Sequence, residues 1–386
     1  MNINSIQRRL ILLGLLLVPF LSLGELINLF NGTIIGQDEY AFGNATGIFK
    51  ISKDIVLITL ICFGVVNYIV TQKASLKLLF YFHLVLVGVL PSLILSVQNE
   101  IIYTAAGTRW LIPILLPFFV YKAVDISFLE KISRYLFVLL LLHFSLQILQ
   151  LYLASSFYGV SSFGLNKRNP GLFFNPNTAS FFTLISMYAI FTFNELTKLT
   201  RLLVIAVSIS SIFLTMSGTG FIVLTLLLSI YYIRKKYVIY FPLVLPFAIA
   251  INMFFLFNLI ERGENYIEMS GDTRVKIFQE VLLTASIFSS NFGHGTNAAV
   301  VVGNASIVDS TFASIVVNLG YWGFFVFIFL LLIGFSYSIL IRSRPLFILL
   351  VIMTFHSATT IIYEVYPANF LSSIFLAYFI KNRNNF

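Results

Sequence analysis

Residues 135–155 read YLFVLLLLHFSLQILQLYLAS, a run with no charged residue and few polar ones. At a rise of 1.5 Å per residue, about twenty such residues cross a hydrocarbon core roughly 30 Å thick. The strands of a membrane barrel would instead alternate apolar and polar residues over segments of about ten residues. The run therefore predicts a membrane-spanning helix, and an all-α fold.

The composition extends this prediction to the whole chain. Of 386 residues, 59% are hydrophobic and only 10% are charged, and the mean hydropathy is +0.96. This apolar share exceeds that of soluble domains, which is about half. We therefore expect a polytopic integral membrane protein with a single transmembrane domain over residues 1–386 and about twelve transmembrane helices. The expected spans are 10–30, 55–71, 78–97, 101–121, 135–155, 179–194, 202–217, 219–233, 238–260, 318–341, 346–363 and 367–380.

Basic residues recur in every second connection between these spans. On the side that holds the N-terminus, 16 basic residues face three acidic ones, a net charge of +13, and the other side carries −4. Because cytoplasmic loops are enriched in Lys and Arg, we expect both termini in the cytoplasm. The charge is scattered over short turns, so it does not form a nucleic-acid-binding patch.

Two outer connections, 156–178 and 261–317, are longer than a turn requires, and long loops are usually functional. The first contains the cations Lys167 and Arg168 and then Asn175 and Asn177 at the start of a helix. Cations, amide donors and the unpaired N–H groups of a helix N-terminus all favour an anion. Alternatively, Pro176 and Asn177 simply start the helix, and the two cations contact lipid headgroups.

The second outer connection, which we expect to be a large periplasmic loop, contains a pattern of helical spacing. From Arg274 to Ser289, apolar residues recur as in an amphipathic helix on the membrane surface, at Val275, Phe278, Leu282 and Ala285. His294 follows between two glycines, and it is either a proton acceptor or a solvated turn residue. Asp309 and Ser310 then precede the next span.

Several of these segments together resemble a known family. They are the stretch from Arg168 to Asn177, the Thr-Met-Ser-Gly-Thr-Gly hairpin at 215–220, Arg274 before an outer helix that ends in Gly293-x-Gly295, and Asp309 leading to Leu319-Gly320-x-x-Gly323. Over residues 160–335 the chain resembles O-antigen polymerases (Wzy type) and O-antigen ligases (WaaL type). Ligases of this family carry a His-Asn pair where this chain has Asp309-Ser310, which favours a polymerase. An Arg-Gly spacing of some polymerases is absent, because positions 179 and 285 are both Ala.

The resemblance implies a GT-C-like glycosyltransferase of the bacterial inner membrane. Such an enzyme joins undecaprenyl-pyrophosphate-linked oligosaccharide units at the periplasmic face, in lipopolysaccharide or related surface polysaccharide biosynthesis. The lipid-linked glycan is then both donor and acceptor. Membrane lipids and a chain-length regulator protein are the further partners it implies, and no cofactor is expected.

The expected chemistry assigns candidate residues. A pyrophosphate leaving group needs a fixed fork of donors, which arginine supplies, and the outer arginines are Arg168, Arg274 and Arg109. Arg109 falls inside the span 101–121, where an ionisable residue is a functional hypothesis by default; the alternative is an interfacial arginine at the end of a shorter helix. Lys167, Asn175 and Asn177 are candidate substrate-binding residues.

The acceptor hydroxyl must lose a proton, and the candidate catalytic bases are Asp309 and His294, with Glu364 more remote. The outer loops lack an Asp-x-Asp motif and any His or Cys cluster, which favours a metal-independent mechanism. Three further histidines, His83, His143 and His356, lie within expected spans, and we interpret them as buried contacts between helices.

Three alternatives stay open. An O-antigen ligase and a peptidoglycan-type glycosyltransferase would share the architecture and much of the chemistry. A lipid-linked oligosaccharide flippase or another transporter would share the size and topology, but it should show a repeat between its halves and helices broken at the midplane. No convincing repeat is present in this sequence, and its polar residues concentrate in the outer loops.

Overall fold

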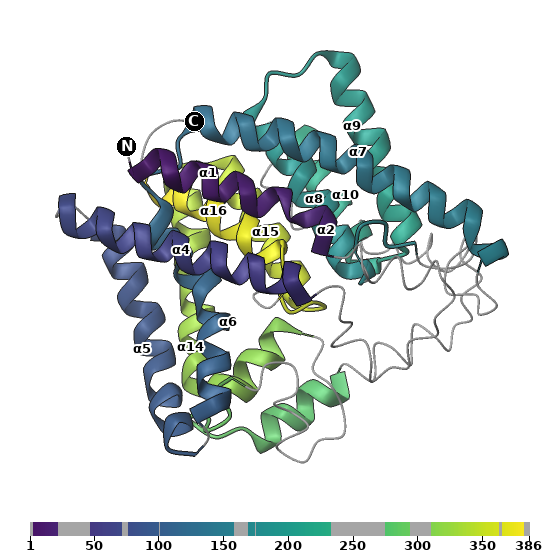
Figure 1. Ribbon diagram of the computed structural model, residues 1–386. Coiled ribbons are helices and arrows are strands. Elements are labelled where there is room, and N and C mark those ends of the chain that lie inside the picture. Colours follow the sequence, from purple (N-terminus) through teal and green to yellow (C-terminus); the bar gives the residue numbers. More distant parts are fainter. Residues whose placement is uncertain are drawn as a thin grey trace. The chain divides into compact units, whose positions relative to one another are not determined.

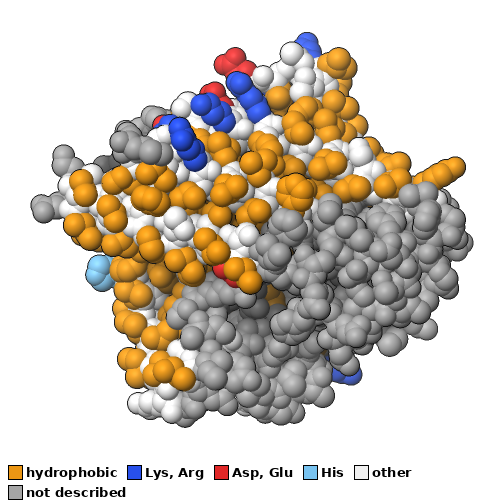
Figure 2. Space-filling view, viewed as in Figure 1, with side chains coloured by type: hydrophobic (Ala, Val, Ile, Leu, Met, Phe, Trp, Pro, Cys, Tyr) orange, Lys and Arg blue, Asp and Glu red, His pale blue; other side chains and the backbone are white. Residues whose placement is uncertain are grey.

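The computed structural model describes residues 3–21, 47–71, 76–99, 101–157, 169–173, 175–232, 275–293, 310–362 and 365–381 (Figure 1). Throughout these ranges the regular structure is helical, without strands. Every expected span overlaps a helix except 238–260, which lies outside the described residues. Six helices are long and apolar enough to cross a membrane: Ile3–Phe20, Ile51–Thr71, Leu78–Gln98, Ile126–Tyr152, Lys198–Thr215 and Thr311–Leu340. Hydrophobic side chains accordingly dominate the described surface seen in Figure 2.

Packing divides the chain into two compact units. Unit 1 comprises Met1–Gln7, Leu57–Val124 and Arg262–Phe386, and unit 2 comprises Arg8–Val56 and Asp125–Glu261. Unit 1 contains the helices α5 (Leu76–Asn99), α6 (Ile101–Val120), α14 (Thr311–Leu340), α15 (Arg344–Ser357) and α16 (Ala368–Lys381). Unit 2 contains α2 (Val18–Leu21), α7 (Ile126–Phe157), α8 (Pro176–Phe193), α9 (Lys198–Thr215) and α10 (Gly218–Tyr232). The division falls inside α1 (Ile3–Leu16) and α4 (Gly47–Thr71).

Prolines inside the helices of unit 1 create some of its helix contacts. A proline has no N–H, so the carbonyl four residues before it loses its partner within the helix. Pro91 releases the carbonyl of Val87 in α5, and the indole Nε1 of Trp322 in α14 donates to it at 2.9 Å. In α6, Pro117 releases the carbonyl of Pro113, which accepts from Ser373 in α16. Neighbouring helices thus satisfy backbone groups that lipid cannot.

Helix α14 is interrupted at Gly320, whose φ of 73° and ψ of −173° are not helical. The N–H groups of Tyr321 and Trp322 donate instead to the carbonyls of Ser286 and Ile287, each at 3.0 Å. A Cβ at position 320 would lie 2.5 Å from the Ile287 carbonyl oxygen. Only glycine therefore fits, for both its dihedral angles and its space.

In unit 2, α8 packs against α7, α9 and α10 and is buried along most of its length. Helix α9 begins at the N-cap Thr197, and it ends at Met216, which is left-handed with φ of 49°. Helix α10 starts two residues later, so the expected hairpin at 215–220 is a tight turn between two helices.

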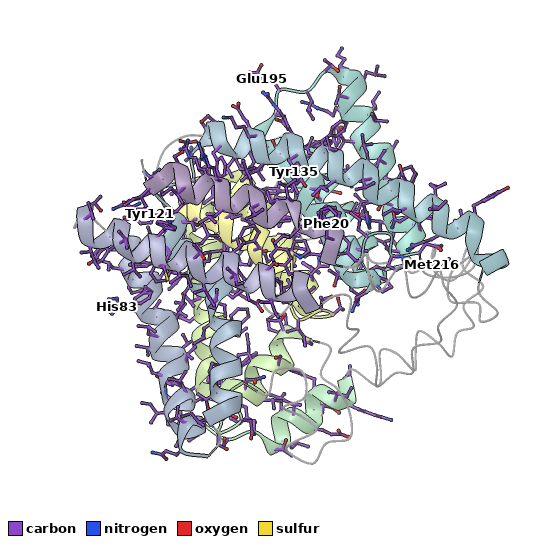
Figure 3. The ribbon with its side chains drawn as sticks, in the orientation of Figure 1. Phe20, His83, Tyr121, Tyr135, Glu195 and Met216 are labelled. Atoms are coloured by element: carbon purple, nitrogen blue, oxygen red, sulfur yellow. The ribbon has the colours of Figure 1, made fainter. Side chains whose placement is uncertain are left out.

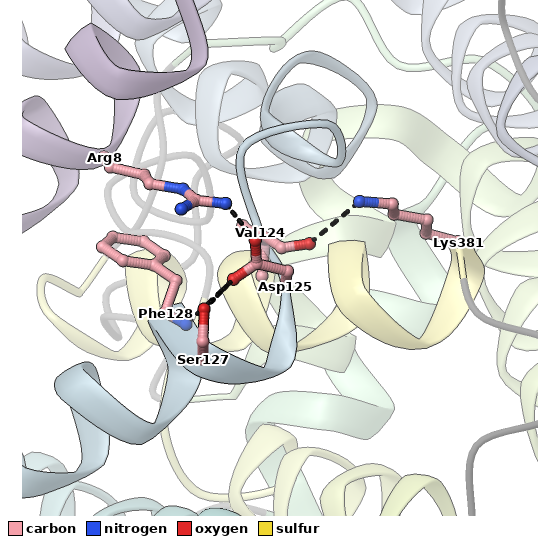
Figure 4. Close-up of polar contacts among 6 residues, drawn as sticks. All are labelled: Arg8, Val124, Asp125, Ser127, Phe128 and Lys381. Atoms are coloured by element: carbon pink, nitrogen blue, oxygen red, sulfur yellow. Dashed lines mark hydrogen bonds and ion pairs between the residues drawn. The ribbon is translucent and has the colours of Figure 1, made fainter.

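The turn before α7 is organised by Asp125, as Figure 4 shows. Its carboxylate accepts from the Phe128 N–H and the Ser127 hydroxyl, both at 2.9 Å, and it pairs with Arg8. Partial burial alone would raise the pKa of this carboxyl, but the hydrogen bonds and the Arg8 guanidinium outweigh it. The pKa of Asp125 therefore lies below its ordinary value of 3.8.

Candidate functional site

Unit 2 holds the part of the predicted motif that the structure describes, residues 169–173 and 175–177. Three polar residues of α7, His143, Gln147 and Gln150, hold this segment, and all three are buried. They are spaced i, i+4 and i+7, which places them on one face of the helix. The helix therefore presents a polar strip to a loop whose backbone groups need partners.

The two glutamines bind the loop backbone directly. Gln150 exchanges two hydrogen bonds with Gly171: its Nε2 donates to the carbonyl at 3.0 Å, and its Oε1 accepts from the N–H at 2.7 Å. Gln147 Nε2 donates to the Asn169 carbonyl at 3.0 Å and to the Ser211 carbonyl of α9 at 3.1 Å. Asn169 N–H in turn donates to Leu214. The loop is therefore fixed by both α7 and α9.

His143 completes this anchor. Its Nδ1 accepts from the Leu172 N–H at 3.2 Å, so Nδ1 carries no proton and the ring is the neutral Nε2–H tautomer. Gly171 adopts φ of 62° beside it, and a Cβ there would lie 2.6 Å from Nδ1. The glycine of the motif is therefore required both by its conformation and by the close approach of the imidazole.

The start of α8 connects the motif to the 215–220 hairpin. Asn175 is the N-cap, and its Oδ1 accepts from the Asn177 N–H at 2.8 Å, with Pro176 in the first turn. Asn177 Oδ1 accepts from the Ser217 hydroxyl at 3.0 Å, and Ser217 Oγ accepts from the Gly220 N–H at 3.2 Å. The interpretation of Pro176 and Asn177 as a helix start is confirmed, because α8 begins at Pro176, and Asn175 before it is exposed.

Most of the other predicted site residues lie outside the described residues: Lys167, Arg168, Arg274, His294 and Asp309. Arg109 lies in α6, eight residues past Ile101 and so about 12 Å along the helix axis. Its backbone position therefore agrees with a residue below the helix end, and its side chain is outside the described part. The roles proposed for these six residues stay predictions, as do the substrate-binding roles of Asn175 and Asn177.

A second assembly, in unit 1, fixes the chain on both sides of residues 294–309. On one side, Phe292 N–H donates to Ser96 Oγ at 2.9 Å, and Ser289 Oγ donates to the Val317 carbonyl beside the break in α14. On the other side, Thr311 Oγ1 donates to the Thr360 carbonyl at 2.6 Å. The segment that contains His294 and Asp309 therefore begins and ends at anchored points of unit 1.

The expected amphipathic helix at 274–289 is shorter than predicted. Residues 275–284 are helical and residues 285–293 are not. The carbonyls of Ser286 and Ile287 accept hydrogen bonds from N–H groups of α14 instead. Phe278 and Leu282 of the 275–284 helix, and Ala285 directly after it, pack against a cluster formed by Val281 and the α14 residues Ala313, Val316 and Val317. The apolar face therefore packs on protein, and Val275 is 55% exposed.

The roles of Gln147 and Gln150 were not predicted from the sequence, and those of the histidines were predicted only in part. The sequence does carry a signal for Gln147 and Gln150. With His143 they recur at helical spacing in an uncharged span, which indicates a polar face on that helix. His143 is buried, as expected, but its partner is the loop backbone. His356 is buried and bonds the Ile352 carbonyl of its own helix, whereas His83 is exposed and projects outward from α5 (Figure 3). The interpretation of His83 as a buried contact is wrong, because its side chain is exposed and its Nδ1 bonds the Leu79 carbonyl of its own helix at 2.6 Å.

A groove of about 540 Å³ lies toward the other end of unit 2. Its lining includes Glu130 and Arg134 of α7 and Glu195 in the loop before α9, which is labelled in Figure 3. None of the predicted site residues is among its described lining residues. The anchored loop and this groove are therefore separate features.

Comparison of the chain with protein-family models, with curated proteins and with solved structures finds no match. The six long apolar helices among the described residues indicate a helical, membrane-embedded protein. An activity for this protein must therefore be inferred from the chemistry of its own polar and charged residues.

Proposed function

We propose that this protein is a membrane glycosyltransferase that polymerises undecaprenyl-pyrophosphate-linked oligosaccharide units at the outer face of a bacterial cytoplasmic membrane. The observation that carries the proposal is the anchored loop at 169–173, followed by the helix start at 175–177. Three buried side chains of α7 and the 215–220 hairpin hold it, and the N–H groups of Asn169, Gly171 and Leu172 all have partners. A rigid loop that follows a pair of cations is the kind of support that a pyrophosphate site requires.

In the proposed reaction, the hydroxyl oxygen of the acceptor sugar attacks the anomeric carbon of the donor. The bond from that carbon to the pyrophosphate oxygen breaks, and undecaprenyl pyrophosphate leaves. Arg168, which directly precedes the anchored Asn169, and Arg274, which precedes the 275–284 helix, neutralise the departing charge together with Arg109. The exposed amide of Asn175 is a further donor. Asp309, or His294, takes the proton of the hydroxyl, and no metal ion takes part.

The ligase alternative uses the same donor and differs in the acceptor. The segment that would carry a His-Asn pair in a ligase ends here in Ser310, whose hydroxyl donates to the Ser357 carbonyl at 3.1 Å. In this chain Ser310 thus connects the start of α14 to the end of α15 through a hydrogen bond. This supports a polymerase over a ligase.

The interruption of α14 bears on the transporter alternative, because transporters use broken helices at the membrane midplane. Twenty residues separate Gly320 from Leu340, which corresponds to about 30 Å, or one hydrocarbon thickness. If Leu340 lies at one boundary, as Arg342 beside it predicts, the break lies near the opposite boundary. That position favours an enzyme whose site opens at the membrane surface.

Gene deletion tests the assignment, with the wild-type gene on a plasmid as the control. Loss of a polymerase should leave single lipid-linked repeat units on the outer side of the cytoplasmic membrane. Loss of a flippase would trap single units on the inner side, and loss of a ligase would leave long lipid-linked chains without transfer. Either of these two results, or unchanged glycan chains, would contradict the proposal.

A further inference from the structure

Unit 1 contains an apolar groove of about 780 Å³ between α5, α6, α14, α15 and α16. Its polar lining side chains are His83, Tyr81 and Tyr337, and the Tyr81 hydroxyl is already bonded to the Ile114 carbonyl at 2.6 Å. Its volume is within the range of about 300 to 1,000 Å³ typical of small-molecule sites. A lining of this kind suits a hydrocarbon chain.

The length of the groove matches one leaflet of a bilayer. Along α14 the lining runs from Phe327 to Tyr337, ten residues, or about 15 Å. Half of a hydrocarbon core about 30 Å thick is also about 15 Å. The groove therefore fits an acyl chain that enters from one membrane surface.

One end of the groove coincides with the ends of its helices. Leu76 is the first residue of α5, Ile380 is the penultimate residue of α16, and Leu346 is the third residue of α15. The residues at these helix ends are cationic: Lys122, Arg342, Arg344 and Lys381. Among the described residues of unit 1, the single acidic residue is Glu280, in the 275–284 helix that packs on the other end of α14. Lys381 Nζ donates to the Val124 carbonyl at 3.3 Å, and the next residue, Asp125, pairs with Arg8. The helix ends beside this end of the groove therefore carry four described cations.

From the apolar lining, the one-leaflet length and these cations, we infer that the groove is a binding site for an anionic phospholipid of the surrounding membrane. One acyl chain lies in the groove, and the phosphate lies at the end marked by Arg344 and Lys381. The expected topology places this end at the cytoplasmic leaflet, whose anionic lipids attract basic residues near the surface. The site differs from the proposed pyrophosphate site in its ligand and, in the expected topology, in its side of the membrane.

Native mass spectrometry of the delipidated full-length protein tests this inference. We would titrate it with phosphatidylglycerol and with phosphatidylcholine of identical acyl chains. Each cation near a membrane surface strengthens anionic lipid binding by roughly fivefold. The wild type should therefore bind phosphatidylglycerol at least about fivefold more tightly, and the double variant Arg344→Gln, Lys381→Gln should lose most of this preference. Arg201→Gln, which removes a cation from unit 2, is the matched control and should leave the preference unchanged.

A second variant tests the groove itself. Leu331 lines the groove, so Leu331→Trp should fill it and weaken the binding of both lipids. The neighbouring Leu332 is 59% exposed and is not a lining residue, so Leu332→Trp is the control. Equal binding of the two lipids, or unchanged binding by Leu331→Trp, would overturn the inference. So would a polyprenyl phosphate that displaces phosphatidylglycerol from the wild type but fails to bind Leu331→Trp, because the groove would then belong to the lipid carrier.

Discussion

Gln150 binds both backbone groups of Gly171, so its replacement should have a large effect for a single side chain. Gln150→Leu keeps the apolar bulk but leaves a buried N–H and a buried carbonyl without partners. Each such group costs about 1 to 3 kcal/mol. We expect a lower thermal unfolding midpoint of the purified protein and shorter glycan chains. Ser145→Ala, on the exposed face of the same helix, should change neither, and an unaltered midpoint for Gln150→Leu would show that the loop is not anchored as described.

If Arg168 and Arg274 bind the pyrophosphate as proposed, the rate of glycan polymerisation should depend strongly on each guanidinium group. Loss of one donor group from a transition-state site commonly costs about 2.7 to 4 kcal/mol, or roughly a hundred- to a thousandfold in rate. Arg168→Ala and Arg274→Ala should therefore nearly abolish long glycan chains at normal protein abundance. Arg→Lys should fail as well, because an ammonium has no planar pair of donors. Gel profiles of the surface glycan, with immunoblots for abundance, would measure this.

Lys167→Ala is the control for these variants, since it removes a neighbouring positive charge but no arginine. It should have a much milder effect. If both arginine variants make glycan chains of normal length, the proposed site is wrong. Arg109 and Arg262 then become the next pair to examine.

Asp125 predicts a small acid sensitivity of unit 2. Its pKa is lower in the folded state than in the unfolded state, so its contribution to the free energy of unfolding is present in full above the unfolded value of 3.8. That contribution is lost as the pH falls through the folded pKa. The Asp125 side chain is 41% exposed, and exposed ion pairs contribute about 0 to 1 kcal/mol. Unfolding midpoints measured from pH 7 to pH 3 should thus fall slightly more for the wild type than for Asp125→Asn, and identical curves would contradict this.

At the scale of elements, Gly320 is the position whose replacement should affect unit 1 most. In Gly320→Ala, the Cβ would lie 2.5 Å from the Ile287 carbonyl oxygen. The φ of 73° with ψ of −173° is a region used essentially by glycine alone, and it would cost about 1 to 3 kcal/mol more. We expect a lower unfolding midpoint and greater protease sensitivity of the 275–293 segment. Gly334→Ala, in the regular part of α14 where the nearest atoms are 3.3 Å away, should be mild. Equal effects of the two substitutions would mean that the break is not required.

The positions of the helices could be predicted from the sequence because hydropathy acts locally, and the run at 135–155 alone specifies most of α7. The interruption of α14 could not be predicted in the same way. It depends on carbonyls of Ser286 and Ile287, more than thirty residues away, and on Ser92, whose hydroxyl donates to the Leu319 carbonyl from another helix. The stretch from Arg168 to Asn177 was recognised as a motif. His143, which accepts from its Leu172 N–H, lies 29 residues before Leu172, where only the polar strip of α7 marks it. Long-range partners of backbone groups leave little trace in a single sequence.

At the scale of the whole molecule, the charge partition of +13 and −4 predicts the topology. A reporter enzyme fused after Phe386 should be active in the cytoplasm, and one inserted near Asn304 should be active outside. Fusions after Arg201 and Arg344 are matched controls that should also report the cytoplasm. An external C-terminus would mean that one span is misplaced, and the assignment of the outer arginines would then fail.

The anchors of the 169–173 loop also constrain how the protein is made. Helix α7 leaves the ribosome before the loop does, so Gln150 and His143 can capture Gly171 and Leu172 as soon as these emerge. The Asn169 N–H, however, needs the carbonyl of Leu214, and Gln147 shares its amide with Ser211. These partners are synthesised some forty residues later, in α9. The nascent chain must therefore insert three helices before the loop acquires its final bonds, and a chain that stalls between α8 and α9 exposes an incomplete loop to quality-control proteases.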